Sequence, residues 1–221
     1  MITVKNITKT FKNGDVETHV LKGIDVQINS GEFVAIMGKS GAGKSTLMYQ
    51  MSLLDHPTTG EIIVDGHNVT NLTHDERTKF RLDNLGYIFQ DYALVPELTA
   101  IENIIVPLLM QGKTDEEAER IAKNSLEKIG LGHRENNLPS QLSGGEQQRV
   151  SIARAVAHNP KILFADEPTA NLDNVSSEAV MEIFKTLHNQ GQTIVMVTHE
   201  KEYTAYCDRV ITISDGQVLG V

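Results

Sequence analysis

The pattern that most constrains this chain is a glycine-rich stretch of eight residues that opens at Gly38 and closes with Lys44 and Ser45. It reads G-x-x-x-x-G-K-[ST], and it lies between the apolar run 33–37 and the breaker-free run 46–54. A strand, a glycine loop and a helix in this order form the setting in which the pattern binds phosphate. The sequence therefore predicts a phosphate-binding loop between a buried strand and a helix.

The residue types of this loop account for the predicted chemistry. Glycines let the backbone turn tightly and bring its N–H groups close to an anion, and the positive end of the next helix adds to the attraction. Lys44 is placed to reach the β- and γ-phosphates, and the Ser45 hydroxyl to ligate Mg²⁺. The alternative is a chance glycine turn. We expect the nucleotide to contact Gly38, Lys39, Ser40, Gly41, Ala42, Gly43, Lys44, Ser45 and Thr46.

Length and composition favour one globular domain, residues 1–221, with a smaller lobe. A hydrophobic content of 40% is enough for a sizeable core. The chain has 20 Lys and Arg against 29 Asp and Glu, a net charge of −9, so no global charge attracts nucleic acid. We therefore expect no nucleic-acid partner.

The single cysteine, Cys207, excludes an internal disulfide and fits a reducing compartment. We interpret it as a small buried residue rather than a nucleophile, because no catalytic histidine can be paired with it. The N-terminus lacks the basic and apolar regions of a signal peptide, and the apolar stretch 101–110 is interrupted and too short to span a bilayer. These features predict a soluble, cytoplasmic chain.

Alternating strands and helices predict an α/β fold with a mostly parallel sheet, preceded by an antiparallel β region. Capping boxes at Thr73/Glu76 and Thr114/Glu117 mark two helix starts. Strands are predicted at 2–7, 19–21, 24–28, 33–37, 61–65, 87–90, 162–165, 193–197, 210–213 and 217–219. Helices are predicted at 47–54, 74–82, 115–129, 144–158 and 175–187. Residues 91–158 then form a helical subdomain inserted into a core made of 1–90 and 159–221.

Three further stretches carry chemistry, and the first is a pair of carboxylates, Asp166 and Glu167, at the end of a predicted strand. Asp166 is placed to help hold Mg²⁺, and Glu167 to orient or deprotonate a water that attacks the γ-phosphate. The alternative is that the pair caps the next helix.

The second stretch, Leu142–Arg149, places Ser143 and two glycines at a helix start, which makes a second anion site. One lysine loop and two anion sites suggest two half-sites, each completed by another protomer. Alternatively, Ser143 only caps the helix while the glycines turn the chain.

The third stretch is Thr198-His199, which follows an apolar strand. A lone histidine is usually structural or solvated. The carboxyl end of a parallel strand, however, is a place where side chains face a ligand.

Together these stretches resemble the nucleotide-binding subunit of ATP-binding-cassette (ABC) transporters over nearly the whole chain. The signature, in this order and spacing, is specific to that class, whereas the Walker motifs are shared with other nucleotide enzymes. One position departs mildly from the family pattern. Phe11 occupies the place where the family often has a tyrosine that stacks on adenine, and a phenylalanine ring can stack on adenine as well. The matching motifs are Walker A at 38–45, the Q-loop at Gln90, the signature at 142–146, Walker B at 162–166, the D-loop at 170–173 and the switch histidine at His199.

Within the class, the stretches 99–109 and 165–170 resemble the lipoprotein-release, macrolide-export and antimicrobial-peptide-resistance subgroup. The resemblance implies a P-loop ATPase that dimerises around two ATP–Mg²⁺ and drives a transmembrane permease subunit at the cytoplasmic face of the membrane. Such a system would export or extrude lipids, peptides or drugs.

The resemblance also implies roles for individual residues. Gln90 and Asp166 serve Mg²⁺, Glu167 polarises the water, and His199 contacts the γ-phosphate. The signature residues close on the nucleotide of the second copy, and Asp173 lies at the dimer seam. The signature residues concerned are Ser143, Gly144, Gly145 and Glu146.

Two other functions remain as alternatives. A P-loop small-molecule kinase would need an acceptor site and an arginine-rich lid, and it would leave the signature and His199 unexplained. A non-transport ABC ATPase usually carries long coiled coils or two cassettes, and this chain has neither.

Overall fold

The strands predicted around the glycine loop form the centre of a six-stranded sheet in a computed structural model that describes residues 1–220. Its order is β10-β9-β3-β8-β7-β6, and every neighbouring pair is parallel except β10 with β9. The predicted mostly parallel α/β fold is confirmed. The strands are β3 (Phe33–Met37), β6 (Leu85–Ile88), β7 (Ile162–Asp166), β8 (Thr193–Val197), β9 (Arg209–Ser214) and β10 (Gln217–Gly220).

The central strands of this sheet are covered on both faces. Every residue of β7 and β8 is buried, which explains their continuous apolar runs. Leu47 and Met48 pack on one face, and Phe184 packs on the other.

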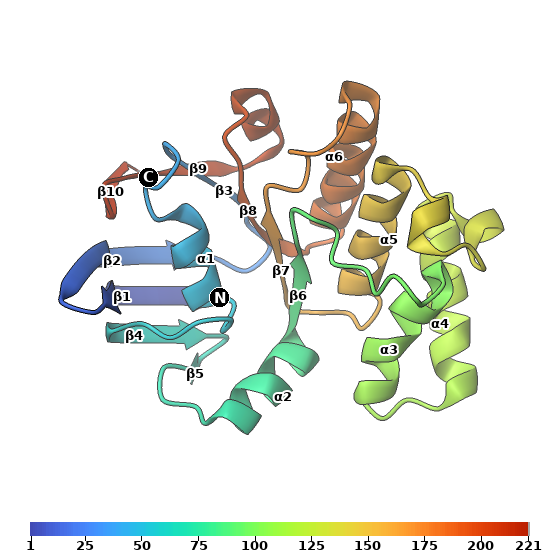
Figure 1. The fold of residues 1–221 in the computed structure, drawn as a ribbon, viewed down its shortest axis with the longest axis horizontal. Coiled ribbons are helices and arrows are strands. Elements are labelled where there is room, and N and C mark those ends of the chain that lie inside the picture. Colours follow the sequence, from blue (N-terminus) through green and yellow to red (C-terminus); the bar gives the residue numbers. More distant parts are fainter. Residues whose placement is uncertain (221) are drawn as a thin grey trace.

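An antiparallel sheet of order β2-β1-β4-β5 lies beside the parallel one (Figure 1). Its strands are β1 (Ile2–Asn13), β2 (Val16–Ile28), β4 (Thr59–Val64) and β5 (His67–Asn68). The two predicted strands at 19–21 and 24–28 are one continuous strand here. Register shifts between β1 and β2 accommodate Asn6 and Gly23, which both have positive φ, so the interrupted alternation marks bulges rather than a strand end.

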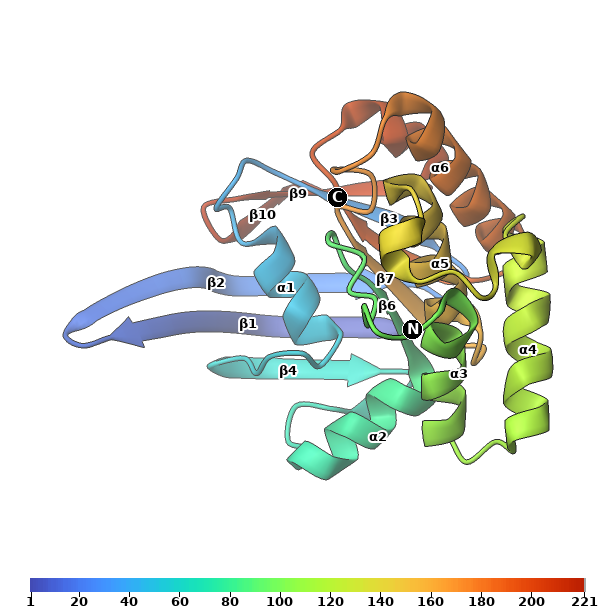
Figure 2. The ribbon, with the colours of Figure 1, turned by 45° about the vertical axis from the view of Figure 1, so that its right-hand side comes forward.

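Helix α1 (Lys44–Met51) lies between the two sheets and contacts strands of both (Figure 2). The helices α5 (Gly144–Val156) and α6 (Asn174–Asn189) pack on the opposite face of the parallel sheet. The remaining helices are α2 (His74–Asn84), α3 (Ala100–Met110) and α4 (Asp115–Lys128), with 3-10 turns at Gly132–Arg134, Pro139–Gln141 and Lys201–Tyr206. None of the helices in residues 1–220 is long and apolar enough to cross a membrane.

Helix α3 was not predicted as a separate helix, because Asn103 and Pro107 interrupt its apolar run. The Asn103 side chain instead ties down the preceding loop: its amide donates to the carbonyls of Val95, Leu98 and Thr99, and its oxygen accepts the Val95 N–H. Asn103, whose residue type disfavours a helix, therefore stabilises the start of α3 through these hydrogen bonds.

The helices α3, α4 and α5 share a hydrophobic cluster whose members all fall within 94–157. Helix α5 also contributes Ile152 and Ala155 to the cluster beneath the parallel sheet. This arrangement agrees with a helical subdomain over 91–158, although α5 belongs to both parts. The boundaries themselves stay a prediction.

Candidate functional site

The predicted site residues converge because β3, β8, β7 and β6 are parallel neighbours, so their carboxyl ends meet at one edge of the sheet. The glycine loop follows β3, and His199 lies just beyond β8. Asp166 ends β7 with Glu167 next to it, and Gln90 lies two residues past β6. Fold topology therefore places four separate motifs side by side.

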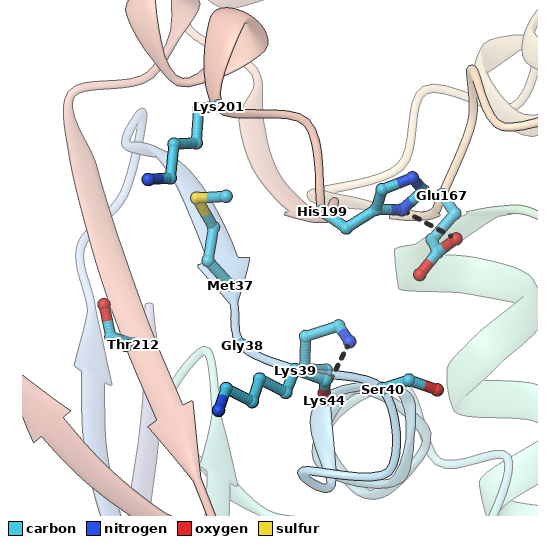
Figure 3. A pocket seen from close by; sticks show the side chains of 9 residues that line it. All are labelled: Met37, Gly38, Lys39, Ser40, Lys44, Glu167, His199, Lys201 and Thr212. Atoms are coloured by element: carbon cyan, nitrogen blue, oxygen red, sulfur yellow. Dashed lines mark hydrogen bonds and ion pairs between the residues drawn. The ribbon is translucent and has the colours of Figure 1, made fainter.

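A cavity of ≈ 740 Å³ opens over the glycine loop (Figure 3). This volume lies in the range typical of small-molecule sites. The side chains of Lys44, Glu167 and His199 are among those that line it, and they come from three of the converging segments. The complete lining is Met37, Gly38, Lys39, Ser40, Lys44, Glu167, His199, Lys201 and Thr212.

Two glycines of the loop are required by close approach as well as by conformation. Gly38 has φ 156°, and a Cβ there would lie 2.1 Å from the Ile213 carbonyl oxygen. Gly43 has φ 103°, and a Cβ there would lie 2.9 Å from Leu21. The loop is thus pressed against both sheets, which fixes its N–H groups in place around the cavity.

The ammonium group of Lys44 is buried although it has no carboxylate partner within residues 1–220. Its Nζ donates to the Lys39 carbonyl oxygen at 3.2 Å, the one bond found for it there. A buried ammonium has three donors, so Lys44 retains capacity to bind phosphate oxygens. Lys39 and Lys201 add positive charge to the same lining.

The carboxylate of Asp166 is held beside the start of α1, where the Ser45 Oγ donates to its Oδ1 at 3.0 Å. Burial raises the pKa of Asp166, and the charge on Glu167 raises it further, whereas hydrogen bonds from Ser45 and Tyr49 and the charge on Lys44 lower it. A hydroxyl and a buried carboxylate side by side are hard oxygen ligands that fit Mg²⁺. No group of three His, Cys, Asp or Glu side chains that could hold a metal ion occurs in residues 1–220.

Glu167 has a strained backbone, with φ at 45°, a left-handed value that is unusual for glutamate. Its N–H donates to the Val197 carbonyl at 3.0 Å, which extends the pairing of β7 with β8 past the end of the strand. The carboxylate then lies 3.2 Å from the His199 Nδ1 (Figure 3). Strain of this kind gathers at functional sites, where surrounding contacts hold it.

The signature residues lie outside this cavity, at the first turn of α5. The Ser143 Oγ accepts the Glu146 N–H at 3.3 Å, and Glu146 accepts the Ser143 N–H at 2.8 Å. The capping interpretation of Ser143 therefore holds within one chain. A Cβ on Gly144 would lie 2.8 Å from the Tyr92 Oη, and one on Gly145 would lie 2.5 Å from the Ser176 Oγ, so either would require the neighbouring side chain to move.

The other predicted residues outside the cavity lining are Gly41, Ala42, Gly43, Ser45, Thr46 and Asp166, which lie in or next to the lining segments, and Asp173, Gln90 and Phe11. Asp173 caps α6 by accepting the Ser176 N–H at 2.9 Å. Gln90 is exposed, and Phe11 is 47% exposed on the β1–β2 hairpin, with the Lys9 Nζ 4.8 Å from its ring centre. Their nucleotide contacts stay predictions.

Sequence reasoning missed Met37, Lys201 and Thr212 as lining residues. Met37 and Thr212 are paired across β3 and β9. Strand order is not local information, so only knowledge that these two strands are neighbours could have found them. For Lys201 the one available signal was its position two residues after His199.

Comparison with known proteins agrees with this geometry. Residues 21–170 match the family described as ABC transporter. An uncharacterized ABC transporter ATP-binding protein of Methanocaldococcus jannaschii is 48% identical over 221 residues, which are 100% of this chain and 99% of that protein. The lipoprotein-releasing system ATP-binding protein LolD of Aquifex aeolicus is 45% identical over 220 residues, which are 100% and 96% of the two chains.

Two further similarities concern a longer protein and a solved structure. The macrolide export ATP-binding/permease protein MacB of Brucella melitensis is 48% identical over 219 residues, and the match covers 99% of this chain but only 34% of that protein. An ATP-binding cassette solved as a dimer in a post-hydrolysis state with ADP and Pi has a TM-score of 0.93 and 42% identity, over 100% of this chain and 97% of the other. From its motifs, its fold and these full-length similarities, the chain belongs to the ABC transporter family, as an ATP-binding cassette.

Proposed function

We propose that this chain is an ATPase that powers a separate membrane protein. The observation that carries the proposal is the Glu167–His199 pair, 3.2 Å apart, in the same cavity as the glycine loop and Lys44. A phosphate loop alone would support binding, whereas a carboxylate and an imidazole at its mouth support attack by water. Relatives that act in lipoprotein release and macrolide export, by their names, support a transport role.

The residues of the site have separate roles in the proposed hydrolysis of ATP. Lys44 and the loop N–H groups hold the phosphates, and Glu167 accepts a proton from the attacking water while His199 contacts the γ-phosphate. Mg²⁺, when bound by Ser45, Asp166 and Gln90, would neutralise charge on the phosphate oxygens. The strained backbone of Glu167 fixes its carboxylate against the cavity before the substrate arrives.

A second copy of the chain completes the site in this proposal. Ser143 and Gly145 lie outside the cavity of their own chain, although they form an anion-binding helix start. The similar cassette solved as a dimer supports a two-chain arrangement. Each copy would close its signature on the ATP held by the other, with Asp173 at the seam, and hydrolysis would release the two copies.

The membrane partner docks, we infer, in a groove of ≈ 350 Å³ between α2, α3 and α5. Apolar side chains stand exposed along it, and this is unusual enough to mark an interaction surface. The groove also contains the loop that follows Gln90, so the partner would be coupled to the nucleotide site. Such docking would place the chain on the cytoplasmic face of a membrane. The exposed side chains are Leu54, Val95, Val106 and Met110.

The variant Glu167→Gln tests the central assignment. It keeps the shape of the side chain but removes the base, so we expect ATP turnover to fall by at least about 100-fold. ATP should then hold two copies together, and gel filtration with ATP should show a dimer where the parent protein runs as a monomer. Glu182→Gln, on the exposed face of α6, is the matched control. Unchanged turnover in Glu167→Gln would show that Glu167 is not the base.

A further inference from the structure

The turn that follows Gln90 has an unusual backbone. Tyr92 and Ala93 both have positive φ, at 59° and 49°. A residue with a Cβ adopts this conformation only where its surroundings hold it there. Two such residues in succession therefore point to a partner that helps to hold the turn.

That partner is Arg154, in the last turns of α5. Its Nη2 donates to the Tyr92 carbonyl oxygen at 3.0 Å, and its Nη1 donates to the Ala93 carbonyl oxygen at 2.6 Å. A guanidinium offers both groups in one rigid plane, whereas lysine offers a single ammonium. The planar fork thus binds two consecutive carbonyl oxygens of the strained turn.

No carboxylate forms an ion pair with Arg154 in the part of the chain that the structure describes. Burial lowers its pKa because it disfavours the charged form. Arg154 is partly buried beside the groove between α2, α3 and α5, and the partners found for its guanidinium within residues 1–220 are the two carbonyls of the turn. Its two hydrogen bonds to the turn are its specific contribution.

The same turn touches two other motifs. The Asn171 side chain donates to the Gln90 carbonyl oxygen at 3.2 Å, and the Tyr92 Oη donates back to the Asn171 carbonyl at 3.4 Å. The Tyr92 Oη also lies 2.8 Å from where a Cβ on Gly144 would stand. The turn held by Arg154 therefore connects Gln90 to the first residue of the helix on which Arg154 lies.

We propose that Arg154 is a positioning residue for ATP hydrolysis and that it acts through Gln90. The inference rests on the proposed function, since it takes Gln90 as a group that serves the Mg²⁺–ATP site. Gln90 is two residues before Tyr92, so the conformation of the turn sets the direction of the backbone at Gln90. Without the guanidinium, the turn relaxes toward negative φ and Gln90 moves with it.

The test is a double-mutant cycle on ATPase kinetics with Arg154→Lys and Gln90→Ala. Arg154→Lys should lower kcat about tenfold, because a shift of about 1 Å in a positioned group has effects of this order or larger. The KM for ATP should change less than about twofold, because the glycine loop still binds the phosphates. In the Gln90→Ala background, Arg154→Lys should cause no further loss.

Two more variants separate positioning from general stability. Arg209→Lys also removes an arginine that binds a backbone carbonyl, that of Gln27 at 2.6 Å, and it should keep the kcat of the parent protein. Ala93→Gly accepts positive φ without strain, so adding it to Arg154→Lys should recover part of the lost kcat. This rescue keeps the inference testable even where Arg154→Lys lowers the melting temperature.

The outcomes are distinct. If the losses from Arg154→Lys and Gln90→Ala multiply, Arg154 acts independently of Gln90 and the inference is wrong. No recovery with Ala93→Gly would likewise contradict the role of strain. If Gln90→Ala leaves kcat unchanged, Gln90 does not serve the Mg²⁺–ATP site, and the inference about Arg154 is wrong as well. The roles proposed for Glu167 and Lys44 do not depend on this result.

Discussion

At the scale of single residues, the clearest prediction concerns the contribution of Lys44 to ATP binding. Its buried ammonium has one carbonyl partner, Lys39, and faces the cavity. Truncation to alanine removes the charge that faces the phosphates, so Lys44→Ala should weaken ATP binding by at least about 100-fold, since a charged hydrogen bond in a desolvated site contributes about 3 kcal/mol. Titration with a fluorescent ATP analogue measures this, with the exposed Lys22→Ala as control. Equal affinity of the two variants for the ATP analogue would show that Lys44 does not bind the phosphates.

The gathering of several of these residues at one site was predictable, because each motif joins a residue type to a local pattern, and their roles stay predictions. Lys44, Asp166 and Glu167 were identified from spacing alone, and the structure brings Glu167 and His199 within 3.2 Å of each other. Backbone strain at Glu167 was not predictable, because nothing in a glutamate signals positive φ. The Glu167 N–H bonds to the Val197 carbonyl across two strands whose pairing is not local, so the setting of this residue is not local information either.

At the scale of elements, Asp55 joins β1 to the end of α1. Burial raises its pKa, but hydrogen bonds from Lys9, the His56 N–H and Gln50 and the Lys9 charge outweigh burial and leave the pKa below its usual value. A carboxylate with a lowered pKa stabilises the fold above the ordinary value of 3.8, and this contribution is lost as pH falls through the folded-state pKa.

Asp55→Asn should therefore destabilise the protein by about 1 kcal/mol at pH 7, after allowance for the partial exposure of the pair. Urea unfolding at pH 7 and at stepwise lower pH measures this, and the gap between the two proteins should close as the pH falls below 3.8. Glu17→Gln is the control, because its ion pair with Lys12 is exposed. A gap that stays constant with pH would contradict the ionic origin.

Element starts were predictable where a capping box marks them, as at Thr73 for α2 and Thr114 for α4, and both boxes are formed. The box at Thr99 was overlooked because Asn103 and Pro107 follow it, although α3 begins there. Propensity counts both residues against a helix, but the bonds of the Asn103 side chain to the carbonyls of the preceding loop offset it. These bonds depend on the conformation of the loop before α3, which its residue types alone do not specify.

At the scale of the whole molecule, the role of Ser143 distinguishes a site made by one chain from a site made by two. Within one chain it only caps α5, through the Glu146 N–H. That bond uses an oxygen lone pair and leaves the hydroxyl hydrogen free to donate, so the cap and a phosphate contact with a second copy are compatible. Capping and nucleotide closure therefore have to be separated by a substitution that preserves one of them.

Aspartate and asparagine separate them, because both cap helices as well as serine does and they have nearly the same size, but only aspartate is negatively charged and only asparagine can donate a hydrogen bond. In the Glu167→Gln background, Ser143→Asp should keep the melting temperature and ATP binding but abolish the ATP-dependent dimer, since its carboxylate would face the γ-phosphate held by the other copy. Ser143→Asn should still dimerise. Gel filtration with ATP compares the two. If Ser143→Asp dimerises as well as Ser143→Asn, this side chain does not approach the partner's nucleotide, and Ser143 serves only as a cap for α5.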